Sequence, residues 1–158
     1  MSAAPRLRVD VAAQRVDLLD GAGAVLWSAP VSTSLHGLGE EEGSNKTPRG
    51  RFRIAEKIGD GASLGTRFVG RQPTGEVWTP DTPPAEVDWI LTRILWLEGL
   101  EPRNANTKQR YVYFHGTNRE DRIGTAASHG CIRLRNADAL ALYERPEVEV
   151  GTEVEIVG

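Results

Sequence analysis

The sequence predicts a mainly β domain, a sandwich of mixed sheets with one short helix and long loops. Alternating apolar and polar residues recur in short runs along much of the chain, which is typical of strands. One segment near the C-terminus combines helix start and stop signals. Many of the 17 glycines and 9 prolines lie between the alternating runs, where loops are expected. The length of 158 residues suits a single domain, 1–158.

The first third of the chain consists mainly of predicted strands. Alternation over residues 7–11 and 16–18 predicts two short strands, and a third is expected over 24–31 after a glycine-containing turn. Residues 35–50 are rich in glycine and acidic side chains, which indicates a solvated loop. Alternation resumes over residues 50–58 and predicts a fourth strand.

The middle of the chain alternates between loops and buried strands. Residues 60–84 are rich in glycine and proline and are predicted to form a long irregular insertion, of the kind that serves as a lid or binding loop. Residues 88–97 are largely apolar on both faces, which predicts a central strand. A polar loop over 98–109 leads into a predicted strand over 110–114, which ends at His115.

A single helix is predicted over residues 137–145. Asn136 is a suitable N-cap, Asp138 favours the first turn, and Pro146 stops the helix. Residues 152–157 alternate again and are expected to close the fold as a strand.

The lone cysteine, Cys131, lies in the run Ser-His-Gly-Cys-Ile-Arg, sixteen residues after His115. A thiol needs a base to become a useful nucleophile, and a paired imidazole can lower its pKa. Residues 116–127 are polar and flanked by glycine, so they are expected to fold back and bring the two side chains together. This is a nucleophile-and-base layout, and it favours catalysis over a buried structural cysteine.

The neighbours of Cys131 supply further candidates. His129 either lines the acyl pocket and assists protonation or only shapes the turn. Gly130 avoids crowding the turn, and the backbone N–H groups of Gly130 and Cys131 are candidates for an oxyanion hole. Ser128 is either an orienting partner of His129 or a plain turn residue. Arg133, two residues past the nucleophile, is expected on the same side and suits bidentate binding of a carboxylate.

These motifs resemble those of the L,D-transpeptidase catalytic domain family, also called the YkuD domain. The His-Gly pair, the loop and the Ser-His-Gly-Cys-hydrophobic-Arg run are similar to the family signature. Residues 31–33 and 46–52 are similar to its serine-threonine turn and its Thr-Pro-x-Gly-x-Phe strand start. Residues 135–156 are similar to its closing helix and strand. The resemblance implies an L,D-transpeptidase-like sandwich with its helix after the catalytic cysteine.

The resemblance also implies a reaction on peptidoglycan stem tetrapeptides. Cys131 would attack the carbonyl of the third residue, commonly meso-diaminopimelate, and expel the terminal D-alanine. His115 would take the thiol proton and later protonate the leaving amine, with its tautomer fixed by the carbonyl of Gly116. Arg133 would hold a free carboxylate of donor or acceptor. Carbapenems are expected to acylate such a cysteine.

Hydrolysis is the outcome we expect from the sequence. Residues 1–10 contain no apolar run of secretory length, and no stretch approaches a membrane helix. As a native start, this segment predicts a cytoplasmic protein, whereas removal of an export segment would make it periplasmic. Recycled tetrapeptides are trimmed in the cytoplasm, and cytoplasmic family members act as L,D-carboxypeptidases. The expected role is therefore L,D-carboxypeptidation in peptidoglycan recycling.

Three alternatives stay open. An amine acceptor would give an L,D-transpeptidase that forms 3-3 cross-links or exchanges D-amino acids. A catalytically idle peptidoglycan-binding module is disfavoured by the intact pair of His115 and Cys131, because binding needs no activated thiol. A cysteine endopeptidase acting on proteins is disfavoured by the length of the resemblance.

Composition argues against several other partners. A net charge of −3 predicts no basic surface for nucleic acid or an anionic membrane. One cysteine and three histidines, without close carboxylates, predict no metal site, and no cofactor is expected. The expected partner is a peptidoglycan-derived tetrapeptide, and the oligomeric state is left open.

Overall fold

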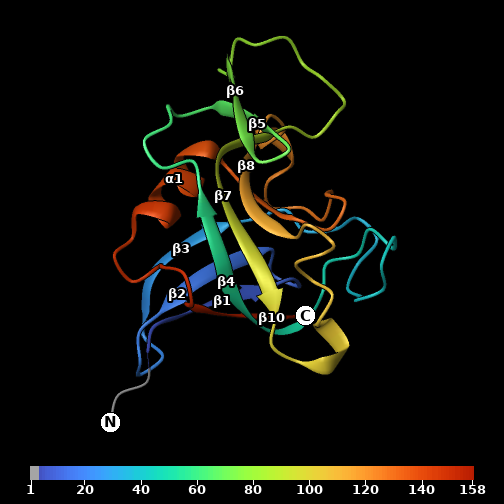
Figure 1. The fold of residues 1–158 in the computed structure, drawn as a ribbon, viewed down its shortest axis with the longest axis vertical. Coiled ribbons are helices and arrows are strands. Elements are labelled where there is room, and N and C mark those ends of the chain that lie inside the picture. Colours follow the sequence, from blue (N-terminus) through green and yellow to red (C-terminus); the bar gives the residue numbers. More distant parts are fainter. Residues whose placement is uncertain (1–3) are drawn as a thin grey trace.

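The computed structural model describes residues 4–158 (Figure 1). Its strands are β1 (Arg6–Asp10), β2 (Arg15–Leu19), β3 (Val25–Pro30), β4 (Gly50–Ile58), β5 (Thr66–Val69), β6 (Gln72–Val77), β7 (Ile90–Gly99), β8 (Tyr113–Thr117), β9 (Ile132–Leu134) and β10 (Glu153–Val157). The helices are α1 (Asn136–Glu144) and two short 3-10 helices, η1 (Pro102–Asn104) and η2 (Glu120–Arg122). None of these helices is long and apolar enough to cross a membrane. The localisation expected from residues 1–10 rests partly on residues 1–3, which lie outside the described part.

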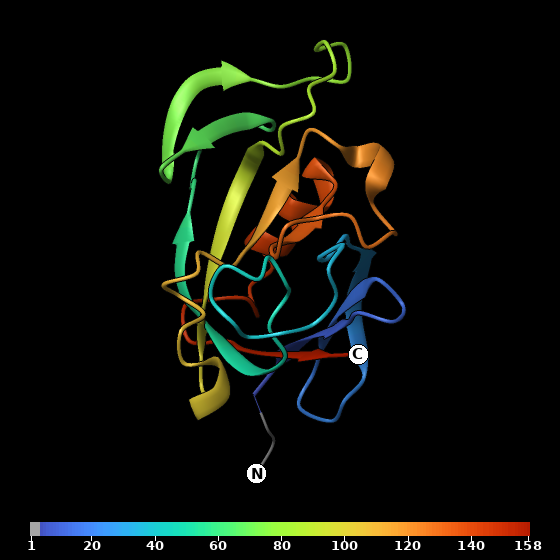
Figure 2. The ribbon, with the colours of Figure 1, turned by 90° about the vertical axis from the view of Figure 1, so that its right-hand side faces the viewer.

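The strands form one curled sheet of mixed pairing. Their order is β3-β2-β1-β10-β4-β7-β5-β6, and β8 and β9 extend from β7. The pairs β1/β10 and β8/β9 are parallel, and the other pairs are antiparallel. The mainly β fold with mixed pairing and one helix is therefore confirmed. The two faces of the predicted sandwich belong to one continuous sheet that curls around its core (Figure 2).

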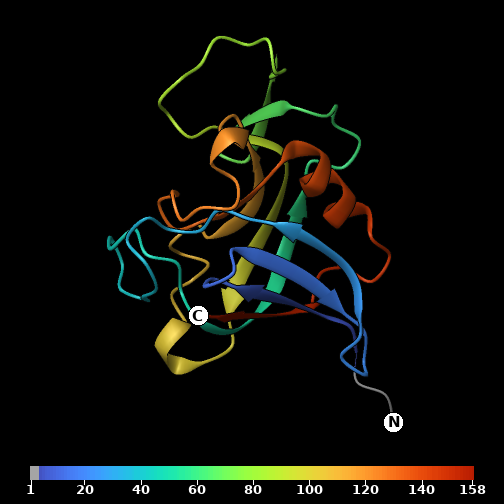
Figure 3. The same ribbon diagram turned by 180° about the vertical axis from the view of Figure 1, so that it is seen from behind.

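The main core fills the inside of the curl. Leu7 pairs with Leu18 and Val9 with Val16 across β1 and β2, and all four are fully buried. They meet inward-facing residues of β4, β7, β8 and β9 in one cluster. The helix α1 lies against β7 and β8 (Figure 3) and adds Leu142 to this cluster. The alternating pattern of the strands thus forms the inner face of the sheet.

β7 is buried on both faces, as its apolar sequence predicts. Leu95 points into the main core. On the opposite face Ile94 packs with Phe68 and Tyr113 in a second cluster, and Cys131 borders that cluster. The candidate nucleophile therefore lies on the outer face of the sheet, away from the main core.

Residues 60–84 are not wholly irregular, which corrects the prediction of an unstructured insertion. β5 and β6 form an antiparallel hairpin, and β5 also pairs with β7, so the hairpin extends the sheet (Figure 2). Pro73 and Gly75 lie in β6, an exposed edge strand. An edge strand tolerates a missing N–H or side chain, so these two residues did not prevent strand formation.

The strand predicted over 110–114 lies further along the chain. Tyr111 has a left-handed backbone with a φ of 57°, which turns the chain before β8 begins at Tyr113. His115 therefore sits inside β8 rather than just past its end.

The helix predicted over 137–145 is present as α1, with a different cap. Its first residue is Asn136, so the N-cap position falls on Arg135. The Asn136 side chain is turned inward, where its Oδ1 accepts a hydrogen bond from Thr92 Oγ1 at 2.6 Å. Asn136 is therefore a buried bridging residue and not the cap that was predicted.

Candidate active site

β8 and β9 place the candidate residues on one face of the sheet. The two strands run parallel with His115 opposite Arg133. Side chains alternate along a strand, so Tyr113 and Cys131, two positions earlier on each chain, share that face. The fold therefore brings the predicted nucleophile, base and arginine to the same side of one strand pair.

The thiol of Cys131 is held by backbone groups in this structure. Its Sγ donates to the carbonyl of Tyr111 at 3.3 Å and accepts from the N–H of Tyr113 at 3.4 Å. Desolvation raises the pKa of Cys131 to about 12, although the Tyr113 N–H and the nearby Arg133 and Arg110 oppose this. The resting thiol is therefore neutral, whereas pairing with His115 was expected to favour the thiolate. Its hydrogen-bond partners are on the adjacent segment and do not include His115.

His115 has the features of a neutral base. It is 2% exposed, and burial lowers its pKa, although the Asp88 carboxylate and the Gly116 carbonyl oppose this shift. Its Nδ1 lies 2.6 Å from the carbonyl oxygen of Gly116. A carbonyl can only accept, so Nδ1 carries the proton and Nε2 is left as the acceptor. The contact expected from the family resemblance is therefore present.

Gly116 is held in place by the start of α1. A Cβ at this position would collide with Asn136 Oδ1 and lie 2.8 Å from the Leu91 carbonyl, so only glycine fits. Asn136 also donates from Nδ2 to the Thr117 carbonyl at 2.9 Å and to the carboxylate of Glu120 at 3.1 Å. These contacts fix the segment whose carbonyl orients His115.

The turn before Cys131 is closed by Ser128. Its Oγ donates to the Cys131 carbonyl at 2.7 Å and accepts from the Gly130 N–H at 3.2 Å. Ser128 is thus a turn residue and not a hydrogen-bonding partner of His129. The Gly130 N–H is already engaged, which corrects its assignment to an oxyanion hole. Among the described residues the Cys131 N–H donates to no acceptor, so it is the better candidate.

Gly130 itself is required by the backbone. Its φ of +126° lies in the region that favours glycine. Its carbonyl accepts from the hydroxyl of Thr47 at 3.0 Å, which ties the turn to the loop between β3 and β4. The same hydroxyl accepts from the N–H of Ser34 at 2.9 Å.

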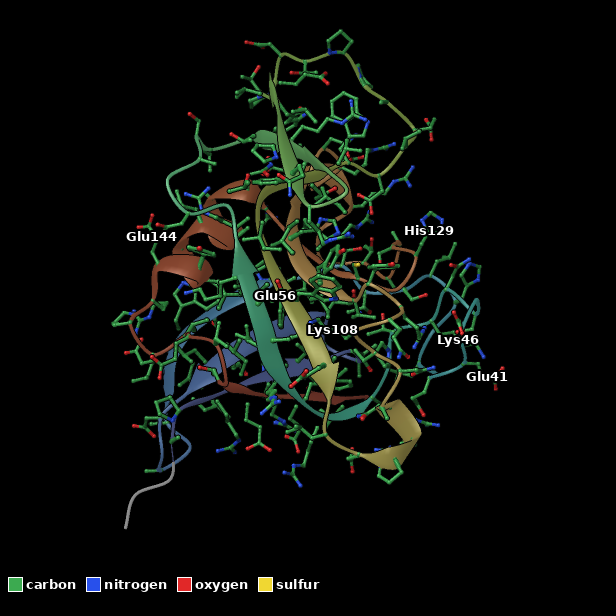
Figure 4. The ribbon with its side chains drawn as sticks, viewed as in Figure 1. Glu41, Lys46, Glu56, Lys108, His129 and Glu144 are labelled. Atoms are coloured by element: carbon green, nitrogen blue, oxygen red, sulfur yellow. The ribbon has the colours of Figure 1, made fainter. Side chains whose placement is uncertain are left out.

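His129 is exposed at the rim of a cavity of about 320 Å³. Figure 4 shows it at the edge of the molecule, on the side where Lys46 and Glu41 lie. Its ring centroid is 6.5 Å from that of His36. The cavity is lined by Glu42, Gly43, Asn45, Gln109, Arg110, Tyr111, Val112, His129, Gly130 and Cys131. His129 therefore lines the cavity that reaches the thiol, and its part in protonation stays a prediction.

Arg133 is on the predicted side but not free to bind a substrate carboxylate. It is 2% exposed, and its guanidinium contacts Asp88 Oδ1 at 3.3 Å and donates to Ser32 Oγ at 3.0 Å. Its Nε is buried without a hydrogen-bond partner. The backbone of Arg133 also pairs with that of Ser32, and the side chain is enclosed and paired internally. The predicted role of Arg133 as a carboxylate clamp is therefore not supported by this geometry.

Asp88 is the residue of the site that sequence reasoning missed. Its carboxylate contacts Arg133, accepts from Thr117 Oγ1 at 3.0 Å, and opposes the lowering of the His115 pKa. The local sequence gave no indication, because Asp88 is only the first residue of the predicted central strand. The available signal was indirect: an arginine buried beside a nucleophile requires a counter-charge.

The site thus combines a neutral thiol, a neutral base with a free Nε2, and a candidate oxyanion donor. Such a set can support acyl transfer through a thioester. Among residues 4–158, no three histidine, cysteine, aspartate or glutamate side chains gather at a spacing suited to a metal ion.

Comparison with known proteins identifies the class to which this fold and site belong. Residues 4–156 match the family described as YkuD, L,D-transpeptidase catalytic domain. The chain therefore belongs to the family of L,D-transpeptidase catalytic domains, which are cysteine-type transpeptidase enzymes.

Individual relatives agree with this assignment. The Bacillus subtilis protein named "Putative L,D-transpeptidase YqjB" is 42% identical over 108 residues, which is 68% of this chain and 50% of that protein. An L,D-transpeptidase structure from Xylanimonas cellulosilytica has a TM-score of 0.62 at 18% identity, covering 99% of this chain and 62% of that one. The structure of LdtMt1 in complex with imipenem has a TM-score of 0.58 at 22% identity, covering 98% and 59%. The matches to curated relatives extend over half of their length or less.

Proposed function

We propose that this protein is a cytoplasmic cysteine acyl-enzyme catalyst that hydrolyses peptidoglycan stem tetrapeptides as an L,D-carboxypeptidase. The bond cleaved joins the L-centre of the third residue to the terminal D-alanine. The observation that supports this most is the neutral His115, with Nε2 free, on the same strand-pair face as Cys131. Family membership supplies the substrate class.

The geometry indicates how the proposed reaction begins. A thiol with a pKa near 12 does not exist as a preformed thiolate at neutral pH, so proton transfer must accompany attack on the carbonyl. The Sγ–H leaves the Tyr111 carbonyl and passes its proton to His115 Nε2 as sulfur bonds to the substrate carbon. The Cys131 N–H donates to the oxyanion that forms.

The second half of the reaction releases D-alanine. The tetrahedral intermediate collapses, the carbon–nitrogen bond breaks, and the imidazolium of His115 protonates the leaving amine. A thioester on Cys131 remains. Water then attacks the thioester, with His115 taking its proton, and releases the tripeptide. An amine attacking instead would complete a transpeptidation.

Hydrolysis is our proposed outcome because polar side chains, among them Asn45, Gln109 and His129, line part of the open cavity beside the thiol. Water therefore reaches the thioester without an acceptor strand being bound. Transpeptidation, giving 3-3 cross-links or D-amino acid exchange, is the second candidate. It is favoured by the name of the 42% identical relative.

The experiment is incubation of the purified protein with a soluble tetrapeptide, followed by mass spectrometry. We expect tripeptide and D-alanine as the dominant products, even when a second stem peptide or a free D-amino acid is supplied. Products of dimerisation or exchange in excess of tripeptide would replace hydrolysis with transpeptidation. No product at all, with retained binding to peptidoglycan, would leave an idle binding module.

Cys131→Ala is the control for the nucleophile. It should fold normally and release no D-alanine, because the acylated atom is absent. Intact-protein mass spectrometry after exposure to imipenem should show one adduct on the unmodified protein and none on Cys131→Ala. Turnover by the variant would remove Cys131 from the mechanism.

A further inference from the structure

The cavity that reaches Cys131 contains one arginine that the proposed mechanism does not use. Arg110 lines this cavity together with His129, Gly130 and Cys131. The other charged side chain in the lining is the carboxylate of Glu42. Arg110 is thus the permanent cation of the cavity in the part of the chain that the structure describes.

The guanidinium of Arg110 is anchored by the loop between β3 and β4. Nη1 donates to the Gly39 carbonyl at 3.3 Å, and Nη2 donates to the Lys46 carbonyl at 2.7 Å and to Ser44 Oγ at 3.4 Å. These acceptors are neutral, so they orient the group without neutralising it. The planar fork is therefore held in one position before any substrate binds.

Arg110 forms no ion pair with a carboxylate among residues 4–158, in contrast to Arg133, which contacts Asp88. Its Nε donates to no described acceptor, and it is not sealed from solvent as the Nε of Arg133 is. Burial lowers the pKa of Arg110, while Glu40, the Cys131 thiol and Glu42 oppose this. A half-buried cation without a paired carboxylate is stabilised when an anion enters beside it.

We propose that Arg110 binds a carboxylate of the stem peptide next to the scissile bond, the role that sequence reasoning gave to Arg133. This inference rests on the proposed function of the site. It adds that the site prefers substrates with a carboxylate next to the scissile bond. The stem tetrapeptide offers two such groups near the attacked carbonyl, the terminal carboxylate of D-alanine and the side-chain carboxylate of diaminopimelate. Nε–H and the remaining Nη1–H of Arg110 can donate a charge-assisted hydrogen bond to either carboxylate.

The test compares three tetrapeptides on wild type and on Arg110→Gln. One peptide is unmodified, one ends in D-alaninamide, and one has lysine in place of diaminopimelate. We expect Arg110→Gln to raise KM for the unmodified peptide roughly tenfold or more, since a hydrogen bond to a charged group is lost. On the peptide that lacks the bound carboxylate, the KM of wild type should rise by a similar factor. Arg110→Gln should not raise KM further on that peptide.

Three controls separate this role from a structural one. Arg110→Lys retains the charge and should recover part of the lost affinity. Arg51→Gln, whose side chain pairs with Glu153 on the exposed face of β4, should leave KM unchanged. Alkylation of Cys131 by iodoacetamide should proceed at the same rate in wild type and Arg110→Lys if the loop and thiol are intact, because both keep the charge that lowers the pKa of the thiol.

Two outcomes would overturn the inference. An equal penalty of Arg110→Gln on all three peptides, or a fall in the alkylation rate of Arg110→Lys that matches its loss of affinity, would show that Arg110 only supports the loop. Release of the terminal residue by wild type, as D-alanine or D-alaninamide, with no dependence on either carboxylate would overturn carboxylate binding while leaving the proposed function in place. Absence of this release by wild type from every peptide would overturn both.

Discussion

At the residue scale, the site pairs two neutral groups in the resting protein. Burial lowers the pKa of His115 and desolvation raises that of Cys131, so neither forms an ion pair before substrate arrives. The hydrogen bond from His115 Nδ1 to the Gly116 carbonyl fixes the tautomer, so that Nε2 is the nitrogen that can accept a proton. In the proposed mechanism, proton transfer therefore accompanies the attack on the substrate.

The neutral state of His115 predicts a specific dependence of stability on pH. An unfolded histidine has a pKa of about 6.5, and the folded pKa is lower. As pH falls below about 6.5, the unfolded chain binds a proton that the folded site does not, so the free energy of unfolding falls until the folded pKa is reached. His115→Gln lacks this contribution.

Urea unfolding of wild type and His115→Gln at several pH values between 7.5 and 5 checks this expectation. The stability difference between the two proteins should shift in favour of the variant as pH falls, because the other titrating groups cancel in the difference. Parallel stability curves over that range would show that His115 titrates normally.

At the element scale, the start of α1 supports the catalytic strand. Asn136 bridges β7, β8 and η2 through hydrogen bonds with Thr92, Thr117 and Glu120. Its side-chain amide also fills the space that a Cβ at residue 116 would need. The helix that follows Cys131 therefore fixes β8, the strand that carries His115. This explains why the helix lies against β7 and β8 rather than elsewhere on the sheet.

Asn136→Ala should accordingly weaken both the fold and the reaction. Loss of the buried amide removes the Asn136 donor from the Thr117 carbonyl and the acceptor of the Thr92 O–H, at a cost of about 1–3 kcal/mol for each unsatisfied group. We expect kcat for D-alanine release to fall more than KM rises, because the freed Gly116 carbonyl orients His115 less well. Denaturant unfolding and steady-state kinetics measure the two effects.

The matched control for this prediction is Arg135→Ala. Arg135 is the exposed N-cap residue and makes no capping hydrogen bond with its side chain. Its variant should stay within about 0.5 kcal/mol of wild type, as exposed substitutions usually do. A rise in KM with unchanged kcat in Asn136→Ala would contradict the positioning role.

At the scale of the whole molecule, the site depends on loops far apart in the chain. The loop between β3 and β4 contacts the turn before Cys131 through Thr47 and Gly130, which are 83 residues apart in sequence. The same loop anchors Arg110 through the carbonyls of Gly39 and Lys46. The cavity beside the thiol thus forms only when these segments are folded together.

Thr47→Val tests this long-range tie with little change in shape. The variant leaves the Gly130 carbonyl and the Ser34 N–H without their hydroxyl partner, which should cost about 1–3 kcal/mol for each buried group. The loosened turn should also slow imipenem acylation of Cys131. Denaturant unfolding and intact-protein mass spectrometry give the two readouts.

Thr125→Val is the control for the loss of a hydroxyl. Thr125 is exposed and donates only to the Arg122 carbonyl within its own turn, at 2.7 Å. Its effect on stability should be within about 0.5 kcal/mol. If Thr47→Val and Thr125→Val had equal effects on stability and on the acylation rate, the contact between Thr47 and Gly130 would not support the site.

The sequence alone determined most of the strands, the helix and the chemical pair. Alternation in residues 7–11 and 50–58 is local, and local alternation is enough to define which face of a strand is buried. The spacing of His115 and Cys131, with the glycines around them, indicated a nucleophile and base. The hairpin of β5 and β6 was missed because its pairing with β7 outweighs the glycine and proline of its own sequence.

Only the tertiary structure decided how the charged groups of the site are used. Arg133 and Arg110 both flank the motif, and nothing in their local sequence shows that one meets Asp88 while the other lines an open cavity. The distinction depends on burial and on partners 45 to 101 residues away, such as Asp88 and Ser32. Desolvation and charge pairing are properties of packed segments, so they arise when the sheet curls and the loops close over it.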